Sequence, residues 1–111
     1  MPQIGTLESF ADGAATLATY HDGRREKSII VVRQGANLQA YEDSCPHQYL
    51  PLSYRGSHVL SADGQRLRCT NHGAEFSAAD GRALSGPSRG AGLTKTPIRL
   101  ERDGRVVAGD D

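Results

Sequence analysis

Two short cysteine–histidine pairs are the residues of this chain best able to do chemistry. They are Cys45-Pro46-His47 and Cys69-Thr70-Asn71-His72, separated by 21 residues, and together they contain both cysteines of the sequence. A thiolate and an imidazole this close together suit a shared metal centre, because both bind iron, copper and zinc. The spacing therefore predicts a metal site built from Cys45, His47, Cys69 and His72.

Two other interpretations compete with a shared iron centre. Structural zinc sites commonly pair cysteine with cysteine and histidine with histidine, whereas each pair here is mixed and the first has one intervening residue. Buried or disulfide-bonded cysteines with surface histidines would leave the paired spacing as a coincidence. The mixed pattern favours a [2Fe-2S] centre in which one iron takes both cysteines and the other takes both histidines.

The chain resembles the Rieske ferredoxins and the Rieske domains of larger oxidoreductases. Their pattern is Cys-x-His followed by Cys-x-x-His-Gly, and Gly73 completes it here. The likeness continues at Pro51-Leu52, Phe76, Gly81, Gly86-Pro87 and the Asp103-Gly104 turn. It implies one Rieske domain over residues 1–111, with cluster-binding loops at about 45–52 and 69–76 and a covering loop at about 85–89.

The resemblance also implies a role for each ligand and a potential for the cluster. Cys45 and Cys69 would bind the buried iron, and His47 and His72 the iron nearer solvent. High-potential members carry a loop-linking disulfide, and at its two positions this chain has Leu50 and Asn71. They also carry a serine and a tyrosine whose hydroxyls bond to cluster sulfur, and at those positions it has Ala74 and Phe76. The resemblance therefore implies a low reduction potential.

One departure concerns the first loop. Many members have glycine two residues after the first histidine, and here that position is Tyr49. Tyr49 either covers the cluster or faces a partner, or it is an ordinary half-buried loop tyrosine.

Short strands must position these loops. Asp-Gly, a strong tight-turn signal, occurs five times. The stretches of β character between these turns are 15–20, 27–33, 37–42, 65–69, 97–101 and 105–108, and each ligand pair follows one of them. The apolar, β-branched run from Ser28 to Arg33 predicts a central strand buried on both sides. We expect an all-β fold, a Rieske-like antiparallel β-sandwich or partly open barrel with a cluster-binding subdomain at one end.

The amino-acid composition limits the classes of partner that this chain is expected to bind. Lys plus Arg and Asp plus Glu both number 13, so the formal net charge is zero, and no basic patch points to nucleic acid or an anionic membrane. The N-terminus lacks the pattern of an export signal, which predicts a cytoplasmic protein. Reduced thiols there would serve as ligands.

The predicted function is that of a one-electron carrier without catalytic residues. Such a ferredoxin would be monomeric and would pass electrons from a flavin-dependent reductase to a terminal oxygenase or other oxidoreductase. The alternatives are a small Rieske-fold subunit of a larger reductase, like that of nitrite reductase, and a metal-bound redox-sensing or interaction module.

Overall fold

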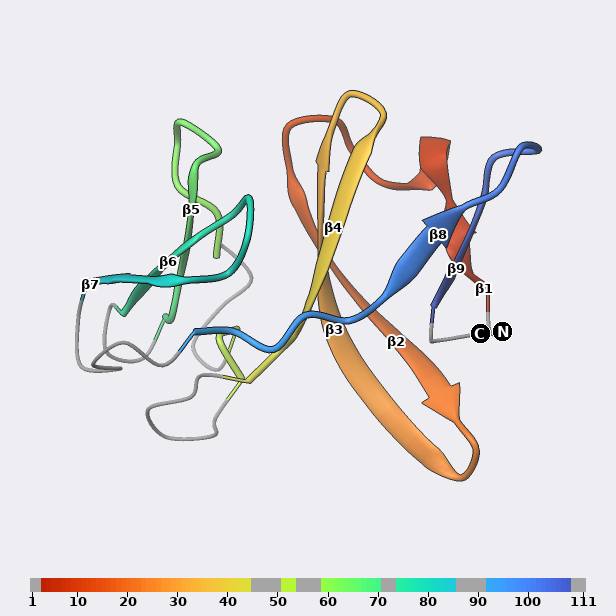
Figure 1. The fold of residues 1–111 in the computed structure, drawn as a ribbon, viewed down its shortest axis with the longest axis horizontal. Coiled ribbons are helices and arrows are strands. Elements are labelled where there is room, and N and C mark those ends of the chain that lie inside the picture. The colour runs from red at the N-terminus through yellow and green to blue at the C-terminus, as the bar shows by residue number, and fades with distance from the viewer. Residues whose placement is uncertain (1–2, 45–50, 54–58, 71–73, 86–91, 109–111) are drawn as a thin grey trace. The chain divides into compact units, whose positions relative to one another are not determined.

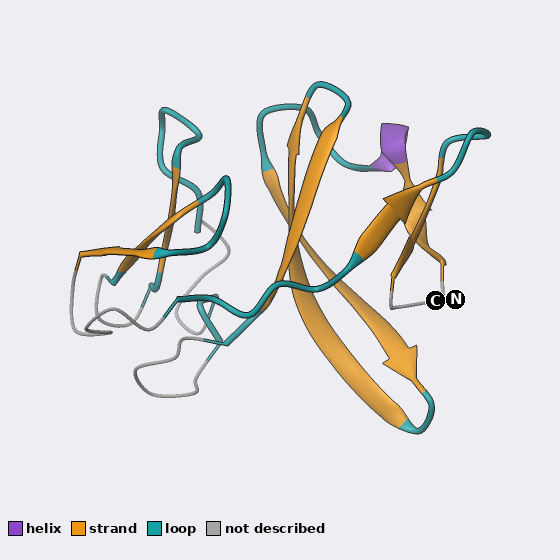
Figure 2. Cartoon of the chain, in the orientation of Figure 1, coloured by secondary structure: helices purple, strands orange, loops and turns teal. Residues whose placement is uncertain are grey.

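The computed structural model describes residues 3–44, 51–53, 59–70, 74–85 and 92–108. These residues form strands, turns and one short 3-10 helix (Figure 1, Figure 2). The chain divides into two compact units, the first made of Met1–Glu42 with Thr96–Asp111 and the second of Asp43–Lys95. No helix among the described residues has the length and apolar character needed to cross a membrane.

The first unit contains two three-stranded antiparallel sheets. One has the order β2 (Ala15–Asp22), β3 (Arg25–Gln34), β4 (Asn37–Glu42). The other has the order β1 (Gln3–Thr6), β9 (Arg105–Ala108), β8 (Ile98–Leu100), and the 3-10 helix η1 (Leu7–Ser9) follows β1. The predicted all-β, antiparallel class is therefore confirmed.

Strand β3 is the centre of its sheet, as its apolar sequence predicted. It pairs with β2 on one side and with β4 on the other. Ile29, Ile30, Val31 and Val32 are all buried, so both faces of the strand are covered. Because β4 pairs with β3 only from Ile29 onward, the first residues of β3 pair with β2 alone and the hairpin extends past β4 (Figure 1).

A hydrophobic core joins the two sheets of the first unit. Its buried members come from both sheets and from the segment after η1, and they are Phe10, Tyr20, Ile29, Val31, Ala40, Val106 and Ala108. Fully burying a valine, isoleucine or phenylalanine side chain stabilises the folded state by about 1.5–3 kcal/mol. Packing of this kind gives the first unit the sandwich architecture that the sequence predicted.

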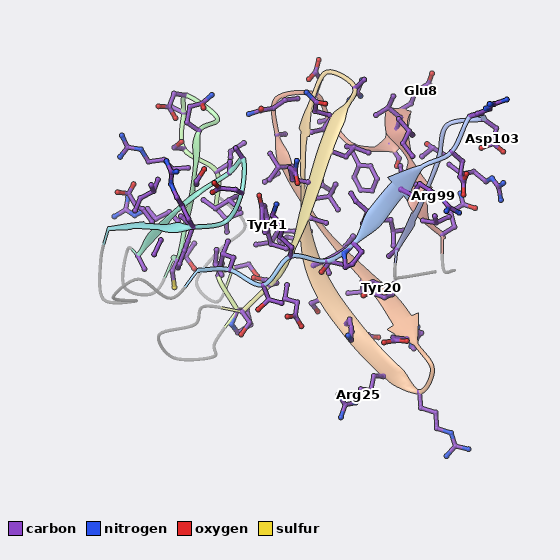
Figure 3. All side chains as sticks on the ribbon, in the orientation of Figure 1. Glu8, Tyr20, Arg25, Tyr41, Arg99 and Asp103 are labelled. Carbon is purple, nitrogen blue, oxygen red and sulfur yellow. The ribbon has the colours of Figure 1, made fainter. Side chains whose placement is uncertain are left out.

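The Asp-Gly dipeptides form the turns that their sequence indicates. Gly23 and Gly104 have φ of 65° and 93°, a left-handed conformation that glycine adopts without strain, and they lie in the β2–β3 and β8–β9 turns. In Figure 3 the Asp103 side chain lies at the tip of the β8–β9 turn and Arg25 lies near the tip of the β2–β3 hairpin.

The second unit holds one small antiparallel sheet with the order β5 (Arg66–Arg68), β6 (Glu75–Ser77), β7 (Ala83–Ser85). A single antiparallel bridge between Leu60 and Leu67 lengthens it on the β5 side. The buried apolar residues among the described part of this unit are Leu52, Val59, Leu67, Cys69, Ala74, Phe76, Ala78 and Leu93. Among the described strands, β1, β6 and β7 were not expected from the sequence.

Candidate metal centre

Of the four predicted ligands, the described residues include Cys69. Cys45, His47 and His72 lie outside them, as do Tyr49, Leu50, Gly73 and the Gly86-Pro87 dipeptide of the predicted covering loop. His58, which was expected to be a surface histidine, is also outside. The structure therefore describes the surroundings of Cys69 and the residues on either side of the segments that carry the other predicted ligands.

Cys69 follows β5 directly and begins the turn that leads into β6. Its backbone N–H donates to the carbonyl oxygen of Ala74 at 2.8 Å, which closes the segment containing Asn71, His72 and Gly73. The side chain carries a free thiol and is 1% exposed. Leu67 and Phe76, which pair across β5 and β6, are fully buried in the same hairpin. The Cys69 thiol therefore lies in the buried interior of the second unit, next to the paired β5–β6 hairpin.

The flanks of the two predicted ligand loops are hydrogen-bonded to each other. Thr70, which lies between Cys69 and His72, donates twice to the carbonyl oxygen of Leu52, from its N–H at 2.9 Å and from its Oγ1 hydroxyl at 2.6 Å. Leu52 comes shortly after His47 in the sequence and is fully buried. The backbone at Leu52, after the first pair, is therefore hydrogen-bonded to the residue that follows Cys69.

A second polar contact closes the base of the first loop. The carboxylate of Asp43 accepts from the Ser53 N–H at 3.3 Å and from the Ser53 hydroxyl at 2.7 Å. Asp43 stands two residues before Cys45, so this contact spans the segment that carries Cys45 and His47. Sequence reasoning missed Asp43, Ser53 and Thr70. The sequence shows only that short polar residues stand beside the ligand segments. Residue type alone does not tell which group each of them hydrogen-bonds.

The segment after the predicted covering loop packs closely on the β6–β7 turn. Leu93 is buried and its N–H donates to the carbonyl oxygen of Gly81 at 2.8 Å. A Cβ atom placed on Gly92 would lie 2.9 Å from the same oxygen, closer than such atoms approach in proteins. Gly92 therefore permits a backbone approach that a side chain would prevent.

The carboxylates of the second unit whose pKa is shifted, Asp63 and Asp80, lie in turns. Hydrogen bonds donated by the Ser61 hydroxyl and, to a smaller extent, by the Gln65 N–H lower the pKa of Asp63. The pKa of Asp80 is lowered chiefly by a hydrogen bond from the Arg82 N–H. His21, predicted to lie on the surface, is exposed at 69% of its side chain and is 3.9 Å from Glu26. No group of three metal-binding side chains occurs among the described residues, of which Cys69 is the one predicted ligand.

The described part of the site suits an iron–sulfur centre. Cys69 supplies a soft thiol donor that is free and buried, and the Thr70–Leu52 hydrogen bonds bring the flanks of both Cys-His segments together. The two compact units, one with two three-stranded sheets and one with a single small sheet, place the chain in the all-β, antiparallel class.

Comparison with known protein families identifies the family of the chain. A sequence profile of the Rieske [2Fe-2S] domain matches residues 9–107, most of the chain. The chain therefore belongs to the Rieske [2Fe-2S] domain family, whose members carry a [2Fe-2S] cluster and use it to exchange single electrons. The resemblance inferred from the two Cys-His pairs is confirmed.

Solved structures share the fold. The ferredoxin of carbazole 1,9a-dioxygenase from Nocardioides aromaticivorans IC177 has a TM-score of 0.76 at 19% identity, covering 99% of this chain and 97% of that one. A complex of reduced oxygenase and oxidized ferredoxin in carbazole 1,9a-dioxygenase contains a chain with a TM-score of 0.73 at 23% identity, with 98% and 93% covered.

A third similar structure is a putative NADH-dependent nitrite reductase small subunit from Mycobacterium tuberculosis. Its TM-score is 0.70 at 18% identity, and the match covers 99% of this chain and 95% of that one. No curated protein matches the sequence.

Proposed function

We propose that this chain is a Rieske ferredoxin, with its cluster held by Cys45, His47, Cys69 and His72. The observation that carries the proposal is the two Cys-His pairs, because they supply the two thiolates and two imidazoles that a Rieske centre needs. When bound, a [2Fe-2S] cluster accepts and releases one electron at a time. The proposed roles are thiolate ligation of the buried iron by Cys45 and Cys69, and imidazole ligation of the outer iron by His47 and His72.

The protein's own contribution is to hold the ligands and to exclude water. The buried Cys69 keeps its thiolate side away from solvent, which affects the reduction potential through the local dielectric. The β5–β6 hairpin fixes the backbone at both ends of the second ligand segment. The match to the Rieske domain and the similarity to a ferredoxin structure support an electron carrier.

We propose a terminal oxygenase as the electron acceptor and a flavin-dependent reductase as the donor. The support is that two similar structures are the ferredoxin of a carbazole dioxygenase and a complex of such an oxygenase with its ferredoxin. The first has nearly the same length as this chain, since 97% of it is covered. The cytoplasm remains the predicted location, where reduced thiols would be available as ligands.

A second candidate is a small subunit of a larger reductase. The observation in its favour is the similar fold of the putative nitrite reductase small subunit. Size-exclusion chromatography of the purified chain, alone and with its reductase partner, separates the two functions. A ferredoxin runs as a monomer and exchanges electrons without remaining bound, whereas a subunit co-elutes with a larger chain.

Metal and sulfide analysis tests the proposal directly. Protein purified without air should contain about two irons and two acid-labile sulfides per chain, and one-electron reduction should give the EPR signal of a mixed Cys/His cluster. Zinc at about one per chain without labile sulfide would overturn the proposal and favour a structural zinc or interaction module.

A further inference from the structure

The base of the first predicted ligand segment is closed by one carboxylate. Asp43 Oδ1 accepts from the Ser53 N–H at 3.3 Å and Asp43 Oδ2 accepts from the Ser53 hydroxyl at 2.7 Å. Both donors of one residue thus meet both oxygens of another, and both residues are partly buried. A charged acceptor forms stronger hydrogen bonds than a neutral one and fixes the orientation of its partner. This contact sets the distance between the two ends of the segment that carries Cys45 and His47.

Leu52, the residue before Ser53, makes the connection to the other ligand segment. The Leu52 carbonyl oxygen accepts from the N–H and from the Oγ1 hydroxyl of Thr70, at 2.9 Å and 2.6 Å. The fully buried Leu52 side chain anchors this peptide. Thr70 follows Cys69 directly, so any shift of Leu52 is transmitted to the backbone of a ligand.

The two contacts share the dipeptide Leu52-Ser53. One runs back to Asp43 at the start of the first ligand segment, and the other runs across to Thr70 inside the second. A continuous path of hydrogen bonds and one peptide unit therefore joins the two segments. All its members belong to the second unit.

We propose that Asp43 and Thr70 are positioning residues for the cluster, holding the two ligand segments at the spacing that a shared centre requires. This inference rests on the proposed function, because it assumes that both segments bind one cluster. Metal ligands are fixed in place by hydrogen bonds from residues that do not touch the metal, and loss of such partners weakens metal binding. The path through Leu52-Ser53 provides this support in the backbone, which explains why short polar residues stand at these positions.

The chain offers a matched control for a merely structural effect. Asp63 accepts from the Ser61 hydroxyl at 2.5 Å and from the Gln65 N–H at 3.0 Å. It therefore makes the same kind of carboxylate contact, with a serine hydroxyl and a backbone N–H, in the same unit. It precedes β5, whereas Cys69 follows that strand, so Asp63 stabilises a turn at the other end.

The experiment compares five variants of the cluster-loaded protein. Thr70→Val removes the hydroxyl and keeps the shape, and Thr70→Ser restores the hydroxyl. Asp43→Asn presents an NH₂ group to one of the two Ser53 donors, and Ser53→Ala removes one donor. Asp63→Asn is the control. For each variant we measure the rate of iron transfer to a chelator, the EPR g values after reduction, and unfolding by far-UV circular dichroism.

The positioning role predicts faster iron release from Thr70→Val, Ser53→Ala and Asp43→Asn. The expected increase is roughly fivefold to tenfold, the size of effect that the loss of one hydrogen bond gives. The EPR g values should shift in the same variants. Thr70→Ser should release iron at the wild-type rate, and Asp63→Asn should do so even where its unfolding transition moves.

Two results would overturn the positioning role. One is wild-type iron release and unchanged g values in Thr70→Val and Ser53→Ala. The other is equal acceleration in Asp63→Asn, which would mean that general destabilisation is responsible. If Asp43→Asn assembles no cluster, Thr70→Val and Ser53→Ala decide, because both retain the carboxylate. Failure of the proposed function is distinguishable, since it would appear as missing iron and sulfide in the wild-type protein.

Discussion

Cys69 is the one predicted ligand that lies within the described residues, and its replacement gives the most direct test of the ligand set. Serine supplies an oxygen donor that is harder and less readily ionised than a thiol, so Cys69→Ser should abolish cluster assembly. The measurement is the visible absorbance and iron content of protein reconstituted under identical conditions. His21→Ala is the control, because His21 is exposed on β2. Retention of the full visible spectrum by Cys69→Ser would show that the ligand assignment is wrong.

Phe76 offers a test of how the protein sets the potential. The Rieske resemblance implies that a tyrosine hydroxyl at this position bonds to cluster sulfur in high-potential members. Hydrogen bonds to sulfur favour the more negative reduced state, so the wild-type midpoint should lie near the low end of the Rieske range, about −150 mV. Phe76→Tyr should raise it, as measured by a spectroscopic redox titration.

The chain contains a matched control for this substitution. Phe10 is the other phenylalanine of the sequence and is also buried, but in the core of the first unit. Phe10→Tyr should therefore leave the midpoint unchanged. A wild-type midpoint above about +100 mV, or an equal change in both variants, would contradict the interpretation.

The turns between strands make a prediction about acid stability. Asp103 accepts from the Arg105 N–H at 3.1 Å and from the Arg105 guanidinium at 2.8 Å. The hydrogen bond from the Arg105 N–H is the main cause that lowers the pKa of Asp103 from its usual range. A group whose pKa is lower in the folded state stabilises the fold above its unfolded pKa, and this contribution is lost as the pH falls through the folded pKa.

Asp103→Asn should therefore lower the free energy of unfolding near neutral pH, and the difference from wild type should shrink below about pH 4. Urea unfolding followed by far-UV circular dichroism at a series of pH values measures this difference. Because Asp103 lies in the β8–β9 turn of the first unit, iron release in acid should affect both proteins alike. A difference that widens as the pH falls would contradict the sign of the shift.

Strands with strong local signals were predicted, and strands that depend on distant partners were not. β3 was expected because its β-branched run must be buried, and β4 and β9 were predicted with their observed bounds. β6 and β7 have three residues each, with one large apolar side chain apiece, Phe76 and Leu84. They become strands by pairing with each other across residues 78–82, and no periodicity within either segment predicts this pairing.

The same distinction applies to the metal centre. Each Cys-His pair could be recognised because its two ligands are close in sequence and of unusual type. The Asp43–Ser53 contact joins residues ten positions apart, and nothing in either residue type specifies the other. The Thr70–Leu52 contact ends on a backbone carbonyl, which has no sequence signature. Support for a site is therefore harder to predict than its ligands.

For the protein and its partners together, the resemblance predicts that electrons pass through the histidine edge of the cluster. Tyr49, Leu50 and Pro51 follow His47 in the sequence and Pro87 belongs to the predicted covering loop. Together they would form a small apolar patch suited to the weak, transient encounters of redox proteins. Since the formal net charge is zero, long-range steering contributes little, and rates should depend only weakly on ionic strength.

Leu50→Glu should accordingly slow electron transfer, because it places a charge where the partner's surface must be desolvated. The visible spectrum and the midpoint potential should remain those of the wild type, since Leu50 is not a proposed ligand. Arg24→Glu is the control, because Arg24 lies in the β2–β3 turn of the first unit and is exposed. Stopped-flow reduction by the cognate reductase at two ionic strengths gives the rates. A larger effect of Arg24→Glu, disappearing at high salt, would place the docking surface on the hairpin and exclude the histidine edge for that partner.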